Sequence, residues 1–459
     1  MDNSLQQYLD LYAGHKDLLK SKSAEGFNSL RDEAYKSLET FGLPKKGSEN
    51  YEITDLLEML KPDYGINLAR IPLDVSPANS FRCGLPQLSN SLFFLLNDMW
   101  GESRDARKNI PEGIEIGPLS SYLSPNNENY HAVKGFYGSL ADVTNPIVAL
   151  NTMLVQEGLF VRVKKGCRFE RPLQLINVLE NTMPLMAIRR ILVILEEDSK
   201  LSIVACNHSS TKTIPMASLS VVEMFVGKNA QLDFYDLEES TTNTNRLSSL
   251  YLKQDRYSKV TINNFTLHNG KSRNEFFCNF NAPDSDLKLY GFGIVGQTNL
   301  VDNYSVIRHE NPRCNTDELF KYVVENEGRA SFIGRIFVAP GAEKTQALQS
   351  NKNIVDSEKA LIFSKPQLEI YNDDVKCSHG SATGQLDPMQ LFYLRSRGLP
   401  EEEAKLLLKQ AFMSDVIEGI QLPILKDRIR SIVEKRFEGE DASCDDCNVA
   451  HCNKIGNLE

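Results

Sequence analysis

The sequence predicts a mainly β protein whose centre is flanked by α-helical regions, and three observations support this. From about residue 130 to residue 375, short polar turns separate runs in which apolar residues alternate. The strands after these turns begin at intervals of about 30 residues or more, at Leu201, Leu232, Val260, Leu287, Ala330 and Leu368. Outside this region the apolar residues follow helical spacing. The recurring unit predicts a stacked β-solenoid, although its period alone leaves a sandwich of hairpins equally open.

Residues 1–110 are expected to form an N-terminal helical region. The sequence Ser29-Leu30-Arg31-Asp32 has the form of a capping box. Apolar residues follow at helical spacing, at Leu30, Ala34, Leu38 and Phe41. Gly42 and Pro44 predict the end of this helix, and a second helical piece is expected over about residues 54–60.

Residues 111–385 are expected to form the β core, and residues 386–437 a C-terminal helical region. Asp387 is suited to cap a helix whose first residue is Pro388. The last segment, residues 438–459, is dominated by Gly, Asp, Asn and charged residues, which predicts a flexible tail.

The composition favours a globular protein of a reducing compartment. Hydrophobic residues make up 41% of the 459 residues, and the formal net charge of −10 argues against binding to nucleic acid or to an anionic membrane. No stretch approaches the roughly 20 apolar residues of a membrane span, and the N-terminus does not read as a secretory signal. The nine cysteines are an odd number and most stand alone, unlike a disulfide framework. We therefore expect a cytoplasmic protein.

The strongest candidate site is the pair Cys377 and His379, which follows an apolar β-type run and precedes a Gly-rich segment. In an extended chain, residues two apart point to the same side, so the thiol and the imidazole can face one common point. These donors suit iron, zinc or copper(I) rather than magnesium or calcium. On spacing alone, chance explains a Cys-x-His sequence more often than a metal site does.

Other motifs are weaker. Cys206 and His208 repeat the Cys-x-His spacing inside a β run, where a place in the core is the favoured interpretation. The segment from Gly291 to Gly296 reads G-x-G-x-x-G but opens no helix, so it fails the context of a dinucleotide site. The tail carries the ligand types of a zinc or iron–sulfur site, without apolar residues to pack around a metal, at Cys444, Cys447, His451 and Cys452. For this tail, adventitious metal binding is favoured.

The residues around Cys377 extend the motif well beyond three positions. Residues 377–380 read C-S-H-G, Gly384 and Asp387 follow, and residues 391–398 read L-F-Y-L-R-S-R-G. This combination closely resembles the SufB/SufD family of iron–sulfur cluster assembly scaffolds. Residues 381–383 depart from the family pattern, but Ser, Ala and Thr keep the loop small.

The resemblance implies a right-handed parallel β-helix core flanked by helical regions, and it favours the solenoid over the sandwich. The segment Phe41-Gly42-Leu43-Pro44, with Glu49, Tyr51 and Thr54-Asp55 after it, is similar to the N-terminal part of SufD-like members. Residues 50–53 read N-Y-E-I and replace an aromatic pair of that pattern. We expect a SufD-like rather than a SufB-like member.

A SufD-like member implies a non-catalytic scaffold subunit that supports iron acquisition and cluster assembly. The expected complex pairs this chain with a SufB-like subunit, and the helices from Asp387 to Phe437 hold a SufC-like ATPase that hydrolyses the ATP. These helices are expected to carry more apolar surface than a cap on the solenoid needs, at Phe392, Phe412, Met413 and Phe437. A transient iron–sulfur cluster is expected at the interface, with His379 and Cys377 as the cluster-assembly residues. No cofactor is expected to be held tightly by the isolated chain. A flavin on the complex and a homodimer of the isolated chain stay open.

Three alternatives remain beside this interpretation. A SufB-like scaffold subunit is the nearest to it. A carbohydrate-active β-helix enzyme would need an acid pair such as Asp373 and Asp374, but adjacent residues of a strand point in opposite directions. A purely structural homo-oligomer would pair the exposed end of the solenoid with itself.

Overall fold

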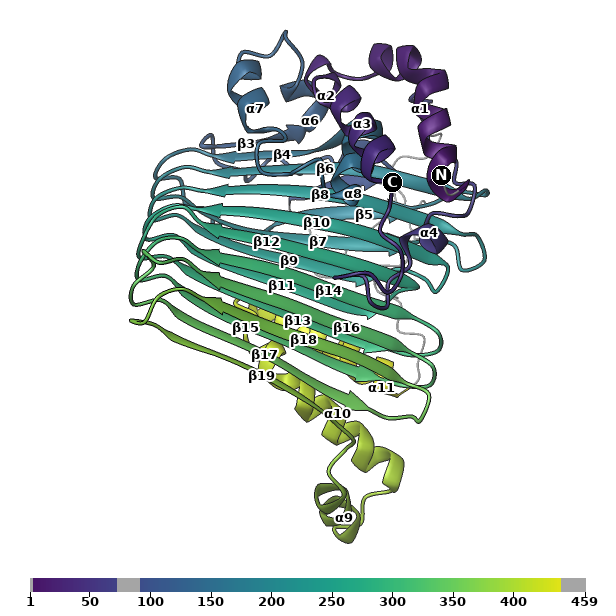
Figure 1. Ribbon diagram of the computed structural model, residues 1–459, viewed down its shortest axis with the longest axis vertical. Helices are drawn as coiled ribbons and strands as arrows, with labels where there is room; N and C mark the ends of the chain where they lie inside the picture. Colours follow the sequence, from purple (N-terminus) through teal and green to yellow (C-terminus); the bar gives the residue numbers. More distant parts are fainter. Residues whose placement is uncertain (1–2, 72–90, 439–459) are drawn as a thin grey trace, which may run out of the picture.

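The computed structural model describes residues 3–71 and 91–438, and a parallel β-solenoid forms its centre (Figure 1). The chain alternates between two sheets, so that each strand of the solenoid pairs with the strand two places further along. For example, β11 pairs in parallel with both β9 and β13. The predicted solenoid is therefore confirmed, and the sandwich of hairpins is wrong.

The two sheets are named here by the numbering of their strands. The odd sheet, which also includes β2, consists of β1 (Leu92–Leu96), β2 (Met99–Glu102), β5 (Leu173–Leu179), β7 (Lys200–Ser209), β9 (Gln231–Glu239), β11 (Lys259–His268), β13 (Asp286–Val295), β15 (Asn315–Val324), β17 (Gln346–Val355) and β19 (Lys376–Gly384). The even sheet, which also includes β3, consists of β3 (Ile114–Pro118), β4 (Glu157–Val163), β6 (Leu185–Leu195), β8 (Met216–Val226), β10 (Thr244–Gln254), β12 (Lys271–Phe280), β14 (Leu300–His309), β16 (Arg329–Val338) and β18 (Leu361–Ile370).

Helices lie at both ends of the sequence. Those before the regular part of the solenoid are α1 (Asn3–Lys22), α2 (Glu25–Asn28), α3 (Arg31–Phe41), α4 (Leu56–Met59), α6 (Leu119–Tyr122), α7 (Tyr130–Phe136) and α8 (Pro146–Leu154). Those after it are α9 (Pro388–Ser396), α10 (Glu401–Glu418) and α11 (Pro423–Phe437). Among the described residues, no helix is long and apolar enough to span a membrane.

The turns that lead into the odd strands share one backbone conformation. A residue in the left-handed region, with φ between 54° and 66°, lies two positions before each odd strand from β7 to β17, at Asp198, Asn229, Tyr257, Asp284, Arg313 and Lys344. Asn and Asp adopt this conformation more readily than other L-residues do. One turn repeated at one corner of the solenoid explains why polar turns recur in the sequence.

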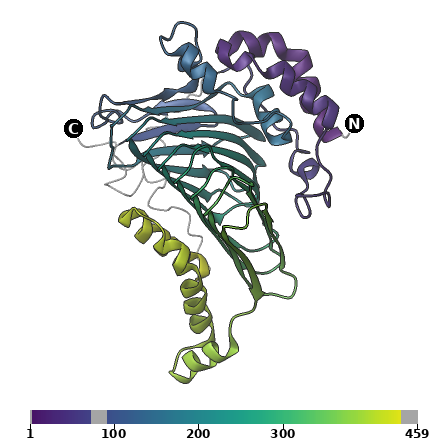
Figure 2. The same cartoon turned by 60° about the vertical axis from the view of Figure 1, so that its left-hand side comes forward.

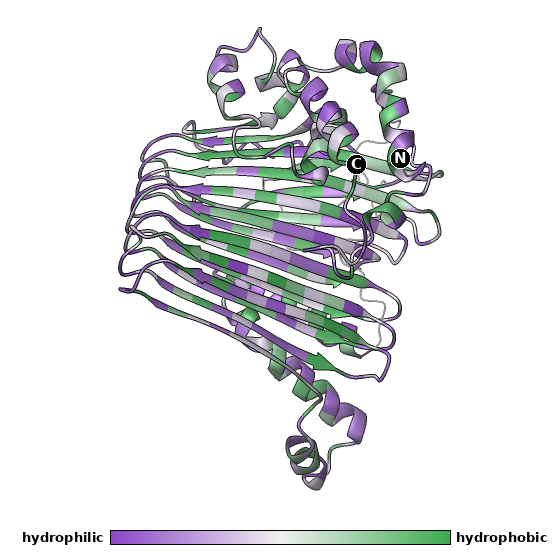
Figure 3. Cartoon of the chain, viewed as in Figure 1, coloured by the Kyte–Doolittle hydropathy of each residue, from purple (hydrophilic) through white to green (hydrophobic). Residues whose placement is uncertain are grey.

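Side chains alternate along each strand, which gives the solenoid one interior and two outer faces. Apolar side chains fill the interior, and polar and apolar residues interleave along the strands in Figure 3. The N-terminal helices cover the outer face of the even sheet, where Met153 and Leu219 share one cluster. Helices α10 and α11 cover the outer face of the odd sheet, where Met413 and Ile429 cluster with Phe292 (Figure 2).

Two expectations for the N-terminal helices need correction. Ser29 does not cap α3, because its hydroxyl donates to a carbonyl of α2 and the N-cap residue Leu30 makes no capping side-chain bond. Phe41 does not belong to the buried stripe of α3, since it is 70% exposed whereas Ala34 and Leu38 are buried. The amphipathic face of α3 therefore ends before its last residue.

A buried ion cluster fastens the segment after α3 to the even sheet. Arg273 of β12 pairs with Asp302 at 2.6 Å and with Glu275 at 3.1 Å, and all three side chains are almost fully buried. The Arg273 guanidinium lies 4.4 Å from the ring centre of Tyr51, whose hydroxyl donates to Glu275. Thr54 donates to Asp302. The charge of Arg273 thus compensates two carboxylates that water does not reach.

Replacement of Arg273 by methionine should destabilise the protein strongly. Two buried carboxylates would lose their only guanidinium partner within this cluster, and loss of one member of a buried ion pair costs about 3–5 kcal/mol. Chemical denaturation of Arg273→Met measures this cost. The matched control is Arg308→Met, because Arg308 and Glu310 form an exposed pair worth about 1 kcal/mol or less. Equal losses in the two variants would contradict the prediction.

Candidate functional site

The solenoid ends on an open turn formed by β18 and β19. Each is the last strand of its sheet, and within residues 3–71 and 91–438 no further strand pairs with either one. Most residues of β19 are exposed, unlike those of β17, the strand before it. Figure 1 shows α9 and α10 extending past this end without covering it. Backbone groups and interior side chains of the last turn are therefore accessible to a partner.

Cys377 and His379 both lie on the inward face of β19. Cys377 is in register with Ala347, and His379 with Gln349, and both of these β17 residues are buried in the interior. Cys377 is half-buried and packs against the interior cluster, whereas His379 is exposed at the open end. Burial raises the pKa of the Cys377 thiol above its ordinary value. The thiol therefore stays protonated at neutral pH unless a metal displaces its proton.

The interior becomes polar as it approaches the open turn. In β17 the inward positions include Asn351 and Asn353, whereas the same columns one turn earlier hold the aromatic rings of Phe320 and Tyr322. Asn353 donates to Thr383 of β19 at 3.0 Å. Across the two sheets, Ser364 of β18 and Ser381 of β19 share a hydrogen bond of 2.7 Å. The exposed end thus presents hydrogen-bonding groups in place of an apolar core.

Two donors do not complete a metal site. In the part of the chain that the structure describes, no group of three or more His, Cys, Asp or Glu residues is arranged to hold a metal ion. An iron–sulfur cluster is normally held by four protein ligands, and most of these are Cys thiolates. Cys377 and His379 therefore need ligands from another chain or from the cargo itself to hold a cluster.

The other candidate ligands lie elsewhere. Cys206 and His208 are in β7, far along the odd sheet from β19, and burial lowers the pKa of His208 to about 4. Cys206 belongs to the apolar cluster under the C-terminal helices. Both residues thus have the structural role that the sequence favoured. Cys444, Cys447, His451 and Cys452 lie outside the described residues.

Helix α9 begins as the sequence predicts and carries an exposed apolar surface. Asp387 accepts a hydrogen bond from the Met389 amide at 2.8 Å, and Pro388 is the first helical residue. The surface consists of four exposed side chains of α9 and α10: Met389, Phe392, Tyr393 and Leu407. A shallow apolar hollow of about 350 Å³ between the two helices is lined partly by Met389, Tyr393 and Leu408. These four side chains are named here the distal apolar surface.

Other apolar residues of these helices are not part of this surface. Met413 is fully buried, and Phe412 and Phe437 pack against the outer face of the odd sheet. The expectation that these three residues offer surplus apolar surface is wrong, because α10 and α11 cover a hydrophobic sheet face. Phe392 remains exposed as expected.

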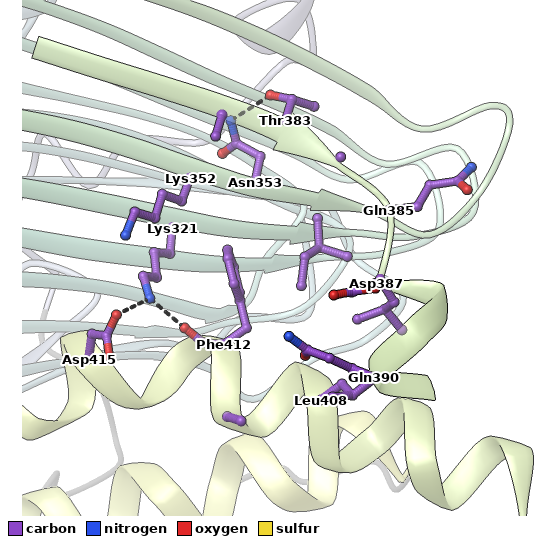
Figure 4. Close-up of a pocket in the computed structure, with 15 residues that line it drawn as sticks. Lys321, Lys352, Asn353, Thr383, Gln385, Asp387, Gln390, Leu408, Phe412 and Asp415 are labelled. Carbon is purple, nitrogen blue, oxygen red and sulfur yellow. Dashed lines mark hydrogen bonds and ion pairs between the residues drawn. The ribbon is translucent and has the colours of Figure 1, made fainter. Parts of the chain in front are cut away.

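Ion pairs hold α10 against the odd sheet beside a cavity of about 540 Å³ (Figure 4). Lys321 of β15 donates to the Phe412 carbonyl at 2.7 Å and to Asp415 at 2.6 Å. Lys409 of α10 pairs with Glu325 and Asp356. The part of α10 from Lys409 to Asp415 is thus held against the odd sheet, while α9 projects beyond the solenoid.

Two family models together match most of the chain, from residue 2 to residue 412. Residues 177–412, over half of the chain, match the model described as SUF system FeS cluster assembly, SufBD core domain. The chain belongs to the SufBD family. Residues 2–175 match the SufBD protein N-terminal region.

Relatives in the SufBD family come from several bacteria. An iron–sulfur cluster assembly SufBD family protein of Synechocystis is 27% identical over 404 residues, which cover 86% of this chain and 87% of the relative. The iron–sulfur cluster assembly protein SufD of Escherichia coli is 34% identical over 175 residues, covering 38% of this chain and 41% of that protein. SufD of Bacillus subtilis is 27% identical over 306 residues, covering 64% and 67%. This chain is thus an iron–sulfur cluster assembly protein of the SufBD family.

The structure also reveals a buried acid that the sequence analysis of this SufBD protein missed. Glu318 of β15 points into the interior, where Ser305 donates to it at 2.5 Å and Gln349 at 2.7 Å. Burial raises the pKa of Glu318 to about 7. The sequence does contain a signal for this column, because Glu318, Gln349 and His379 are separated by about one repeat of the solenoid each. That signal is hard to use before the register of the turns is known.

Because the pKa of Glu318 is raised in the folded protein, the stability of the fold should depend on pH. The folded protein binds this proton more tightly than the unfolded chain, so stability falls as pH rises from about 4.5 to about 7 and then levels off. Glu318→Gln removes this loss. The difference in unfolding free energy, variant minus parent, should therefore be more positive at pH 8 than at pH 5, by up to about 3 kcal/mol. Urea denaturation at both pH values measures this, and a difference independent of pH would contradict it.

Proposed function

We propose that this chain is the SufD-like subunit of a SufBCD-type complex, in which it supports iron acquisition and de novo cluster assembly as a non-catalytic scaffold. The observation that carries the proposal is the open last turn of the solenoid, where β18 and β19 leave their edges unpaired and Cys377 and His379 face the exposed end. The SufD relatives of Escherichia coli and Bacillus subtilis support the choice of subunit.

The open turn suits a SufB-like partner. Unpaired strand edges bind another chain through backbone hydrogen bonds, and a partner with a similar solenoid end would continue both sheets. Cys377 and His379 give two of the donors that a cluster needs, so the partner would bring the others. An incomplete ligand set also suits a scaffold, because it must release its cluster to an acceptor.

The distal apolar surface suits an ATPase partner. Met389, Phe392 and Tyr393 are each more than half exposed on a short helix that projects beyond the solenoid. Clustered exposed aromatic and Met side chains are typical of protein interfaces. Because ion pairs hold α10 to β15 and to the residues that follow it, a movement of the bound ATPase would be transmitted through α10 to the end of the odd sheet.

The alternatives predict different assemblies. A SufB-like role would pair this chain with a separate SufD-like chain, and a structural homo-oligomer would pair two open turns of this chain. The glycan-enzyme alternative has little support, since Asp373 and Asp374 lie in an exposed turn before β19 rather than in a groove. The SufBD family match also favours cluster assembly.

Native mass spectrometry of the tagged chain recovered from its host tests the proposal. We expect one complex that contains this chain, a SufB-like chain and the ATPase. Recovery of the chain solely as a homo-oligomer, or with a SufD-like partner in place of a SufB-like one, would overturn it. Addition of a chelator during recovery is the control for assemblies that depend on bound metal.

A further inference from the structure

One column of interior positions changes its chemistry over the last three turns of the solenoid. On the odd sheet, successive in-register positions of this column are Ile262, Leu289, Glu318, Gln349 and His379. In-register residues of neighbouring strands lie about 4.8 Å apart, so their side chains stack as a ladder. An apolar column thus becomes acid, amide and imidazole as it reaches the open end.

The even sheet opposite is adapted to these polar groups. The facing column runs through Ser305, Gly334 and Pro366. Ser305 donates to Glu318 at 2.5 Å. At Gly334 a Cβ atom would lie 2.4 Å from the Gln349 amide nitrogen, so the absence of a side chain leaves the space that this amide occupies.

The amide of Gln349 has one satisfied end and one unsatisfied end. Its nitrogen donates to Glu318 at 2.7 Å, on the side of the earlier turn. Its oxygen is buried and has no hydrogen-bond partner within the described chain. Gln349 is only 2% exposed, so an unused acceptor there costs stability. The next residue of the column is His379, whose imidazole has an N–H to donate.

We infer that Gln349, held by Glu318, is a positioning residue that accepts a hydrogen bond from His379 and so leaves the other imidazole nitrogen free for iron. The inference rests on the proposed role of His379 and names the residues that would support it. A ligating histidine usually donates its second N–H to a neighbouring acceptor, which fixes its tautomer and its orientation.

A purely structural role explains the column poorly. Glu318 is completely buried, its hydrogen-bond partners are neutral, and burial of an acid without a cation is costly. Leucine fills the same position one turn earlier, at Leu289, without any such cost. Stability alone would favour an apolar residue at both Glu318 and Gln349.

The decisive variant is the double substitution Glu318→Leu/Gln349→Leu, which continues the apolar column of the earlier turns. We expect it to fold with unchanged or higher thermal stability in the full complex. Its iron and sulfide load should fall about tenfold or more, as for other residues that orient a metal ligand. In the His379→Ala background it should cause no further loss. The conservative variant Glu318→Gln, which keeps a partner for the Gln349 amide, should retain the load.

A spectroscopic readout separates this inference from the proposed function. In the ¹⁵N-histidine-labelled chain, the ratio of the two His379 tautomers should change when Gln349 becomes leucine, and the other histidines should not respond. An unchanged ratio, or a full cluster load in the double variant, would overturn the inference. A changed ratio together with a full load in His379→Ala would support the Gln349–His379 bond and overturn the cluster role of His379.

Discussion

Replacement of His379 by alanine should remove most of the iron and sulfide carried by the assembled complex while the chain remains folded. His379 is exposed at the open end of the solenoid, so its removal should lower the unfolding free energy by no more than about 1.5 kcal/mol, which includes the loss of its inferred hydrogen bond to Gln349. It lies on the inward face beside Cys377, where it would be one of few donors from this chain. Iron and sulfide analysis of the purified complex, together with its melting temperature, measures both effects.

Two further variants make the His379 experiment specific. Ser378→Ala is the matched control, because Ser378 is an exposed neighbour on the opposite face of β19. Cys377→Ala should cause a smaller loss than His379→Ala if the partner provides the main thiolates. A full cluster load in His379→Ala would remove this residue from the mechanism. A variant that fails to fold would show instead that His379 is structural.

Replacement of Phe392 by glutamate should weaken binding of the ATPase by about 30-fold or more. Phe392 is 68% exposed at the distal apolar surface, and a residue at the centre of an interface contributes about 2 kcal/mol or more. Glutamate is a good helix former, so α9 should persist. Calorimetric titration of the chain with the purified ATPase measures the affinity, and circular dichroism checks the fold.

Phe41→Glu is the matched control for the change at Phe392. Phe41 is 70% exposed and belongs to α3, at the opposite end of the molecule (Figure 1). The Phe41→Glu substitution introduces the same charge at an equally exposed phenylalanine. The affinity of this variant for the ATPase should therefore stay within about twofold of that of the parent chain. Equal losses in both variants would point to a general charge effect. Unchanged binding by Phe392→Glu would place the ATPase elsewhere on the chain.

Local features of the sequence predicted the regular strands of the solenoid and the start of α9, but not β1 and β2 or helices α6 to α8. Alternating apolar residues and recurrent polar turns predicted the strands, because strand periodicity and turn conformation depend on neighbouring residues. Asp387 and Pro388 likewise predicted the start of α9, since an N-cap acts within one helical turn. The length and spacing of the motif around Cys377 identified the family that the family models then confirmed.

Contacts between distant residues required the tertiary structure. Ser29 fitted a cap and Met413 and Phe437 fitted a docking surface, but burial and partners from other elements decided against these roles. The column of Glu318, Gln349 and His379 shows the physical reason. Turns of unequal length separate the strands, so only the folded register shows which side chains stack between turns. The motif around Cys377 and His379 was enough to recognise the family and, through it, the solenoid, whereas register and burial decided which side chains lie beneath His379.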